Sequence, residues 1–441
     1  MAVTSTFLPN MNNVFYKRGA HTSEAPAPNL TKIAIFQLQL PQQPRKKELQ
    51  EQRIRLFVYS SSSNRNFRAS GTHAAISLRD KGKTIIVIEK KARLGGHTET
   101  YTDPSTNTAQ DYGVAIYHNI SAVRDYFGRF GVPLVAQNEN GSTSVNFDFR
   151  TGKPVNITSP SPEAVGAAMG KYAAFLSQYP QLNDGMFLPS PVPEDLTMPF
   201  GEFVTKYGIE ALVQTMFTTN QGAGDILSVP MVENARVSGL DLIEQLASSS
   251  FLTTARHNNS ELYGKAQGEL LEAESLLLSS EVVHSVRTDD HGVKLIVQTP
   301  TGAKLILAQK LLITIPPRLE FLGPFALRDS ERDVFAKLVD VGYYATLITD
   351  TGIPDELLLL QAANPTRFQK TLPKIVVYTS HAPFYLQATP QDIKAGIYAK
   401  MYALQGLGST YWSGATFRAQ DSSMIWRYNE EVVLPMVLKG L

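Results

Sequence analysis

The most regular alternation of apolar and polar positions in this chain begins at Gly71. Residues 72–81 have the spacing of a helix with small side chains on its packing face. Gly82 stands where that helix should end, because glycine readily adopts the left-handed conformation found there. A run of β-forming residues, 84–88, follows and ends at the acid Glu89. A helix followed by a buried strand is the second half of a β-α-β unit, so the pattern predicts an α/β nucleotide-binding fold.

The region before Gly71 is less regular. Residues 1–50 are rich in proline, glutamine, asparagine and serine and have no lasting apolar period, so we expect them to be disordered or loosely attached. Residues 54–59 predict a strand, and the polar stretch 60–66 predicts a turn. The regular fold is therefore expected to start with this one upstream strand.

Further along the chain, the spacing of apolar residues predicts a helical insert between two parts of the nucleotide fold. A run of three helices would form this insert and cap a substrate cavity, and a three-stranded meander would lead back to the sheet. Pro316 and Pro317 stop the meander, because proline has no N–H to continue a strand ladder. The predicted elements are helices at 121–131, 162–179, 200–207 and 209–217, a hairpin around 145–153 and the meander at 282–315.

Composition narrows the class of protein. The 441 residues are 43% hydrophobic and 18% charged, which suits a globular protein with a large core. The net charge of +1 gives no reason to expect nucleic acid as a partner. The absence of cysteine excludes disulfides, thiolate nucleophiles and a cysteinyl-linked flavin.

No targeting or membrane segment is visible in the sequence. Apolar runs stay below the roughly 18 residues that a membrane helix needs, and residues 1–20 lack the apolar centre of a signal peptide. No compartment is assigned, and the cytoplasm is the default expectation. No zinc-ligand spacing, Ser-His-Asp signature or Walker loop occurs, so no metal site is predicted.

The candidate chemistry lies directly after the strand at 84–88. An acid at the end of the second strand, here Glu89, accepts hydrogen bonds from the ribose hydroxyls of a dinucleotide. Arg93 can donate to phosphate, and the doublet Gly95-Gly96 lets the backbone come close to a pyrophosphate. The order strand, acid, arginine and glycine pair predicts FAD rather than NAD.

The phosphate loop before this strand is atypical. A nucleotide fold needs its first strand to lead directly into G-x-G-x-x-G. Gly71 stands at the third glycine position, but Asn66 and Arg68 stand at the first two, and the predicted strand ends several residues too early. Three explanations stay open: Asn66, Arg68 and Ser70 bind phosphate through their side chains; the protein has lost its cofactor; or residues 1–67 come from an incorrect gene model. The abrupt start of the regular pattern favours the last.

Three stretches carry a resemblance to a known family. RLGGHTETY (93–101), LLITIPP (311–317) and TYWSGATFRAQDSSMIWR (410–427) resemble the flavin-containing amine oxidase superfamily, and more narrowly the fungal oxidoreductases grouped with β-cyclopiazonate dehydrogenase. The resemblance runs from about Ser70 to the C-terminus. It implies a Rossmann-like FAD-binding domain with a mixed α/β substrate domain of the amine-oxidase type.

The resemblance also implies roles for single residues. Expected cofactor-binding residues are Gly71, Glu89, Arg93, Gly95, Gly96, Val282, Gly414 and Ala415, and substrate-site candidates are Tyr117, His118, Tyr411 and Trp412. Ala415 stands where amine oxidases often have a cage tyrosine, which argues against simple amine oxidation. No catalytic base is identified, and Tyr263 and Lys265 are expected on a solvated surface.

These inferences combine into one expectation of function. We expect an FAD-dependent oxidoreductase that dehydrogenates or oxidatively cyclises a small secondary metabolite, with hydride passing to flavin N5. The alternative is a non-catalytic remnant that has lost FAD through its degenerate phosphate loop. The expected division is an atypical segment at 1–53, FAD-binding parts at 54–135, 266–320 and 406–441, and substrate-domain parts at 136–265 and 321–405.

Overall fold

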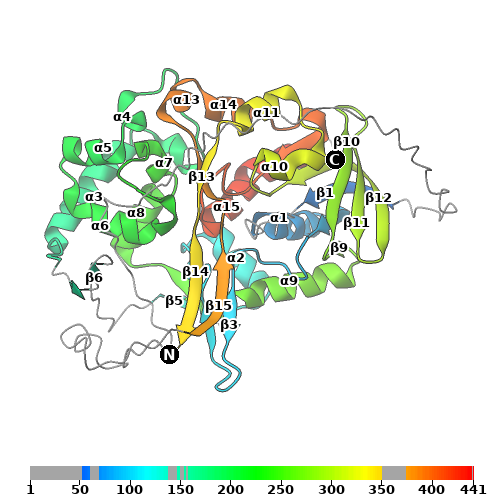
Figure 1. The fold of residues 1–441 in the computed structure, drawn as a ribbon, viewed down its shortest axis with the longest axis horizontal. Coiled ribbons are helices and arrows are strands. Elements are labelled where there is room, and N and C mark those ends of the chain that lie inside the picture. Colours follow the sequence, from blue (N-terminus) through cyan, green and yellow to red (C-terminus); the bar gives the residue numbers. More distant parts are fainter. Residues whose placement is uncertain are drawn as a thin grey trace, which may run out of the picture.

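A computed structural model describes residues 52–59, 69–137, 147–148, 153–154, 157–349, 374–439 and 441 (Figure 1). Asn66 and Arg68, and most of the predicted hairpin around 145–153, lie outside these residues. Among the helices of the described part, none combines the length and apolar composition needed to cross a membrane.

A seven-stranded sheet forms the centre of the nucleotide-binding half. Its strand order is β10-β11-β12-β1-β2-β9, and β17 pairs with the C-terminal end of β12. β1, β2, β9 and β17 run parallel to their neighbours, whereas β10, β11 and β12 form an antiparallel meander. The strands are β1 (Gln52–Tyr59), β2 (Ile85–Ile88), β9 (Leu276–Leu277), β10 (Glu281–Arg287), β11 (Val293–Thr299), β12 (Gly302–Ile313) and β17 (Thr410–Trp412).

The predicted first strand lies at the middle of this sheet. In β1, Val58 is opposite Val87 of β2 on one side and Leu312 of β12 on the other. The chain thus supplies its own central strand, although the residues between β1 and the next helix, 60–68, are outside the described part. The predicted helix, strand and meander are confirmed, and so is the predicted α/β fold class.

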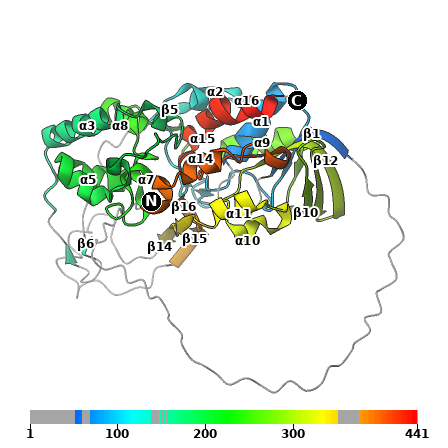
Figure 2. The same ribbon diagram turned by 90° about the horizontal axis from the view of Figure 1, so that it is seen from above.

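Helices from both ends of the chain cover one face of the sheet (Figure 2). α1 (Ala69–Asp80) packs on β1 and β2, and α15 (Ser422–Tyr428) packs on α1 and α2 (Ser121–Arg129). Asp421 caps α15 by accepting the Met424 N–H. The other helices that the structure describes outside the insert are α9 (Ser260–Glu272), α10 (Leu319–Leu322), α11 (Asp329–Phe335), α13 (Pro390–Lys394), α14 (Ile397–Tyr402), the π-helix η6 (Asn429–Val433) and α16 (Leu434–Leu438).

The predicted helical insert is confirmed as a group of short helices beside the sheet (Figure 1, green). The stretch predicted as one helix at 209–217 begins instead with a 3-10 turn, η2 (Glu210–Leu212), because the left-handed Gly208 has just ended the preceding helix. The insert contains α3 (Pro162–Leu176), η1 (Pro180–Asn183), α4 (Glu194–Thr197), α5 (Phe200–Tyr207), α6 (Val213–Thr219), η3 (Gln221–Ala223), α7 (Met231–Ala235) and α8 (Leu240–Ser248).

Small two-stranded sheets lie outside the seven-stranded sheet, and one of them stands between the insert and the nucleotide half. The longest pair, β14 with β15, stands between them in Figure 1. These strands are β3 (Thr100–Thr102), β4 (Ala109–Asp111), β5 (Leu134–Ala136), β6 (Phe147–Asp148), β7 (Lys153–Pro154), β8 (Leu252–Thr254), β13 (Val339–Val341), β14 (Tyr344–Thr349), β15 (Lys374–Ser380) and β16 (Phe384–Gln387); the 3-10 turns η4 (Gly323–Phe325) and η5 (Leu407–Ser409) complete the description. The domain boundaries given above stay a prediction.

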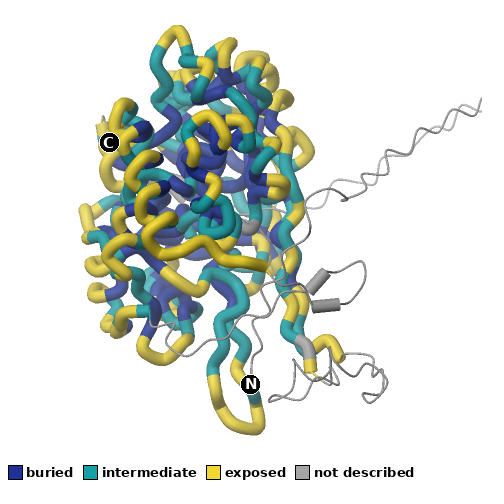
Figure 3. The backbone as a smooth tube through the Cα atoms, turned by 90° about the vertical axis from the view of Figure 1, so that its left-hand side faces the viewer, coloured by how far each residue is buried: buried dark blue, intermediate teal, exposed yellow. Residues whose placement is uncertain are grey.

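One continuous buried core joins both halves (Figure 3). It includes the four residues of β2 and the insert aromatics Phe200 and Phe203. Trp426 of α15 is also fully buried. Because this core is continuous from the sheet to the insert, the two halves are packed against each other.

Candidate functional site

Four parallel strands end at one edge of the sheet. Because β1, β2, β12 and β17 run in the same direction, the residues after them share that edge, where ligands of open α/β sheets bind. Glu89 follows β2 and Ser413 follows β17. Three strand spacings separate these two ends, roughly 14 Å at about 4.8 Å per spacing, so the edge suits an elongated ligand.

Glu89 is a fully buried acid at this edge. The Lys91 N–H donates to its Oε1 at 2.6 Å, and its own backbone is fixed between Leu277 and Ser280. Buried carboxylates require hydrogen-bond donors. The Ser280 N–H donates to the Glu89 carbonyl, and Val282 follows Ser280 by two residues, at the start of β10. Val282 is buried and pairs with Val297.

The loop after Glu89 has the backbone conformation that its glycines allow. Gly95 and Gly96 have φ of 109° and 56°, which side-chain-bearing residues rarely adopt. Arg93 donates from Nη1 to the Leu94 and Thr98 carbonyls at 3.1 and 3.4 Å. This arginine therefore folds over its own loop.

Glu99 forms ion pairs with two cations beside that loop. Its Oε1 lies 3.0 Å from Arg93 Nη2 and 3.4 Å from Lys91 Nζ, and the Tyr112 hydroxyl donates to Oε2 at 2.6 Å. Burial would raise the pKa of Glu99, but the Tyr112 hydrogen bond and the two cations outweigh it and lower the pKa. The carboxylate is thus held in its charged form.

Two close contacts fix the glycine loop in place. A Cβ on Gly95 would lie 3.2 Å from the Tyr263 ring, and a Cβ on Gly113 would lie 1.8 Å from the His97 carbonyl oxygen. Tyr263 is fully buried, so its predicted surface position is wrong, whereas Lys265 is exposed as expected. The apolar spacing of Leu262, Tyr263, Ala266 and Leu270 on α9 was the signal that could have shown this burial.

The turn after β17 presents backbone donors. Ser413 to Ala419 are buried, and Gly414 has φ of 107° with Thr314 O only 3.3 Å from where a Cβ would be. Among the residues that the structure describes, the N–H groups of Ala415 and Thr416 have no hydrogen-bond acceptor. Since buried N–H groups are nearly always satisfied, these two donors indicate a ligand position.

A buried polar network joins this turn to the start of α1. The Ser70 and Ser413 hydroxyls lie 2.9 Å apart, and Ser413 donates to Asn429 Oδ1 at 2.5 Å. Asn429 Nδ2 in turn donates to the Ser70 carbonyl at 3.0 Å. Gly71 in the first turn of α1 is therefore held beside the turn after β17, and the Ser70 hydroxyl is engaged within the protein.

A group of rings lies on the insert side of the glycine loop, and we call it the substrate-side cluster: His97, Tyr343, His381 and Phe384. The rings of His97 and His381 meet edge to face at 4.0 Å, and Phe384 lies within 5.7 Å of both His97 and Tyr343. Gly222 of the insert lies against Phe384, since a Cβ there would be 2.0 Å from the ring. The candidates expected from the sequence include none of these four rings, because no motif marks them as a group.

The predicted substrate residues Tyr117 and His118 lie apart from that cluster. Tyr117 is fully buried, with its ring stacked on Trp426 at 5.6 Å. His118 Nε2 lies 3.4 Å from Asp421 Oδ2 at the start of α15. Burial would raise the pKa of Asp421, but the contacts with His118, Met424 N–H and Ser423 lower it to about 2.

Tyr411 and Trp412 of β17 directly precede the donor turn. Tyr411 is half-buried, with Lys310 Nζ 5.2 Å from its ring centroid. Trp412 is fully buried and meets Phe335 edge to face at 4.8 Å and stacks on Phe417 at 6.3 Å. Trp412 therefore packs against the turn through its contact with Phe417.

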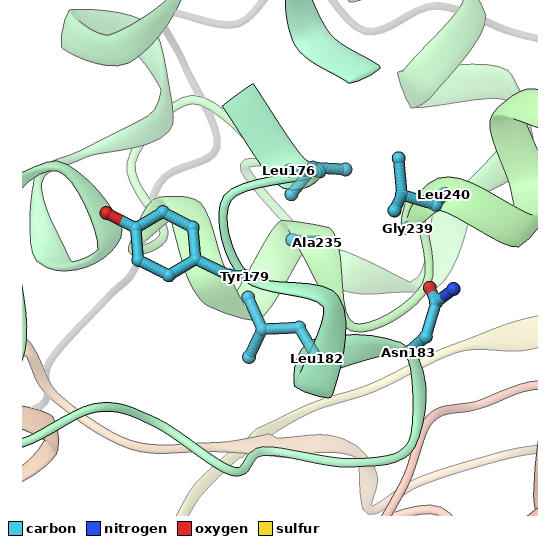
Figure 4. A pocket seen from close by; sticks show the side chains of 7 residues that line it. All are labelled: Leu176, Tyr179, Leu182, Asn183, Ala235, Gly239 and Leu240. Atoms are coloured by element: carbon cyan, nitrogen blue, oxygen red, sulfur yellow. The ribbon is translucent and has the colours of Figure 1, made fainter. Parts of the chain in front are cut away.

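A cavity in the helical insert is too small for a substrate (Figure 4). It lies between Leu176, Leu182 and Leu240 and has a volume of about 10 Å³. That volume holds at most about one water molecule.

The residues at the sheet edge fit a dinucleotide. A buried acid after β2, two left-handed glycines, the first turn of α1 and two N–H donors with no acceptor in the described part of the chain occur along one edge. Carboxylate suits ribose hydroxyls, and N–H groups suit phosphate or ring oxygens.

Comparison with known proteins agrees with this geometry. Residues 69–130 match the family described as NAD(P)-binding Rossmann-like domain. The chain is 42% identical over 434 residues to the FAD-dependent oxidoreductase oblC of Cochliobolus heterostrophus, covering 85% of this chain and 90% of the relative. It is 31% identical over 421 residues to β-cyclopiazonate dehydrogenase of Aspergillus oryzae, covering 83% and 90%.

Solved structures share the fold. A fatty acid isomerase from P. acnes superposes with a TM-score of 0.65 at 17% identity, covering 87% of this chain and 98% of that one. Putrescine oxidase superposes with a TM-score of 0.59 at 14% identity, covering 88% and 100%. The predicted Rossmann-like and amine-oxidase-like architecture is confirmed, and the chain belongs to the family of fungal FAD-dependent oxidoreductases that includes β-cyclopiazonate dehydrogenase.

Proposed function

We propose that this protein binds FAD along the carboxyl edge of its sheet and uses it to dehydrogenate or oxidatively cyclise a small secondary metabolite. The observation that carries the proposal is the pair of buried N–H groups on Ala415 and Thr416, which find no acceptor among the described residues. Relatives named as FAD-dependent oxidoreductases over most of their length support the choice of ligand.

Each part of the edge has a separate binding task in this proposal. Glu89 accepts hydrogen bonds from the ribose, and the first turn of α1 with Gly71 faces the pyrophosphate. Gly95 and Gly96 let the backbone approach the ligand closely, and Ala415 and Thr416 donate to the ring system. Binding by these groups uses backbone and buried atoms, so it depends less on the two missing loop glycines.

Bound FAD would supply the hydride acceptor, which is chemistry that protein side chains lack. The protein orients the substrate and excludes water. The substrate-side cluster is suited to this task, because His97, Tyr343 and Phe384 are half-buried rings at the junction of insert and glycine loop. Aromatic walls pack well against flat, unsaturated molecules.

The proposed substrate is therefore a small, conjugated molecule. One fungal relative is named β-cyclopiazonate dehydrogenase and another is named an FAD-dependent oxidoreductase, and these names support dehydrogenation of a small molecule. Amine oxidases often have a tyrosine of the aromatic cage at the position of Ala415. Alanine leaves more space there, which favours a substrate larger than a simple amine.

The test is the visible spectrum and thermal stability of the purified full-length protein with and without FAD. We expect flavin absorption bands that stay with the protein through gel filtration and a melting temperature that rises with FAD but not with NAD. A colourless protein whose melting temperature does not respond to FAD would contradict the proposal. The same preparation, mixed with a panel of conjugated indole and polyketide metabolites, should show bleaching of the flavin band without oxygen.

A further inference from the structure

We propose that Arg236, in the helical insert, is a positioning residue that aims the Ala415 and Thr416 N–H groups at the flavin. This inference rests on the proposed function and adds to it a residue from outside the nucleotide half. Arg236 follows α7 and lies about 180 residues before the turn it holds.

The guanidinium of Arg236 is fully engaged and inaccessible to solvent. Its Nη2 donates to the Ala415 and Thr416 carbonyls at 2.9 and 3.0 Å, and its Nε donates to the Arg418 carbonyl at 3.3 Å. Its Nη1 donates to the Leu386 carbonyl at 2.8 Å and to Glu233 Oε2 at 2.8 Å. All five N–H donors of the side chain thus have partners.

These contacts determine where the neighbouring N–H groups point. In a trans peptide, the carbonyl and the following N–H point in opposite directions. The Ala415 carbonyl points to Arg236, so the Thr416 N–H points away from it. The Gly414 carbonyl accepts from Phe417 N–H at 3.0 Å, so the Ala415 N–H points away from the interior of the turn. Arg236 therefore fixes the direction of the Thr416 N–H directly, and it restrains the Ala415 N–H by holding the next two peptides of the same turn.

Glu233 makes the buried arginine tolerable. Its Oε1 accepts the Ala388 N–H at 2.9 Å and the Tyr398 hydroxyl, and its carbonyl accepts the Tyr385 hydroxyl. A buried ion pair gives little net stability, because the cost of removing both charges from water offsets their attraction. Stability alone is therefore a weak reason for burying Arg236 with Glu233. What the buried arginine does is hold four backbone carbonyls in a fixed geometry.

The chain contains a matched control pair. Arg287 and Glu331 form a second buried ion pair, with side chains 2% and 0% exposed. Arg287 joins β10 to α11 and also donates to the Ala326 carbonyl, at 3.3 Å. Within the described part of the chain, its hydrogen bonds go to Glu331 and Ala326 and not to residues 413–418, so its replacement perturbs a buried arginine without touching the donor turn.

The experiment compares Arg236→Lys and Arg287→Lys in the full-length protein. Lysine keeps the charge but has a single nitrogen, so it cannot hold the Ala415, Thr416, Arg418 and Leu386 carbonyls together. We expect Arg236→Lys to raise the Kd for FAD about tenfold and to shift the bands and reduction potential of the bound flavin. Arg287→Lys should lower the melting temperature of the protein and leave the spectrum and potential of the flavin unchanged.

A milder variant keeps the proposal testable if Arg236→Lys does not fold. Tyr398→Phe removes one donor to Glu233 and keeps Arg236, and it should shift the flavin spectrum in the same direction by a smaller amount. Unchanged flavin spectra, potentials and affinity in the folded variants would overturn the inference while the proposed function stood. Failure of the wild-type protein to bind FAD would overturn both.

Discussion

The two ends of the sheet edge have opposite chemistry on the same topology. After β2, the buried Glu89 presents carboxylate oxygens, which accept hydrogen bonds. After β17, the turn presents the N–H groups of Ala415 and Thr416, which donate. A dinucleotide with hydroxyls at one end and a ring with carbonyl oxygens at the other matches this order of acceptor and donor.

The two ends also differ in what holds them. Glu89 is fixed by local contacts, since the Lys91 N–H two residues away donates to its side chain. The donor turn is fixed from far away, by Arg236 in the insert and by Asn429 through Ser413. The difference teaches that the acceptor end is assembled by one β-α-β unit, whereas the donor end requires the whole fold.

The largest expected effect is that of Gly113→Ala on stability. The new methyl would lie 1.8 Å from the His97 carbonyl oxygen and 2.9 Å from the Glu99 backbone nitrogen, and neither atom can move without the glycine loop. We expect a loss of about 3 kcal/mol or more in the free energy of unfolding, measured by urea denaturation. Gly128→Ala, at a helical glycine with no atom near the added methyl, is the control and should be neutral or stabilising. Equal stability of both variants would show that the acceptor end tolerates rearrangement.

Removal of the acceptor itself should come next. We expect Glu89→Ala to weaken FAD binding by roughly 10- to 150-fold, because a charged hydrogen-bond partner contributes about 1.5–3 kcal/mol. The measurement is an FAD titration followed by quenching of flavin fluorescence. Glu281→Ala, which removes a half-exposed acid at the start of β10, should leave the Kd unchanged. If both variants bound FAD like the wild type, the ligand would not use the β2 end.

The donor end is tested by Gly414→Ala. Its φ of 107° disfavours any side chain, and the methyl would meet Thr314 O at 3.3 Å. We expect a loss of about 1–2 kcal/mol in unfolding free energy and a weaker affinity for FAD, because the turn must shift. Gly406→Ala, at φ 89° on the other side of β17 and with the nearest atom 3.7 Å away, controls for backbone strain alone. A change in FAD affinity in both variants alike would remove the distinction.

The smallest expected effect is a pH dependence at Asp111. Burial raises the pKa of this carboxyl to about 6, against the opposing hydrogen bonds from Thr100 and the Asn259 N–H. Between pH 4 and 6 the folded state then holds a proton that the unfolded state has released, so this group makes stability fall as pH rises through that window. Asp111→Asn should lessen the fall, and the stability of the variant relative to the wild type should grow from pH 4 to 6.

Chemical denaturation at several pH values measures this difference. The amide oxygen of asparagine can keep both hydrogen bonds, since Thr100 and Asn259 both donate to Oδ1. A difference between variant and wild type that is constant with pH would show that Asp111 titrates normally.

Part of the site could be predicted because its residues are neighbours in sequence. Glu89, Arg93, Gly95 and Gly96 lie within eight positions, and their order after a buried strand carries the chemistry. Arg93 was expected at phosphate, and the structure places its guanidinium against Glu99 and its own loop. Side-chain direction in a loop depends on which charge is near, and that charge was not readable from the spacing.

The substrate side could not be predicted for a different reason. His97, Tyr343, His381 and Phe384 lie on three separate stretches, and each looks ordinary in its own sequence context. Tyr117 and His118 were expected at the substrate from the family resemblance, yet their partners are Trp426 and Asp421 of the C-terminal helix region. Proximity along the chain is a poor guide where strands and helices from distant segments interleave.

The sequence by itself determined the elements of the nucleotide half, because helix and strand periods, terminating glycines and the acid after β2 are local properties. It also determined the chemical identity of the acceptor end. The tertiary structure alone decided that β1 occupies the centre of the sheet, that Arg236 holds the turn after β17, and that four rings from three segments meet. These features depend on contacts between residues far apart in the chain, and such contacts exist only after the core has packed.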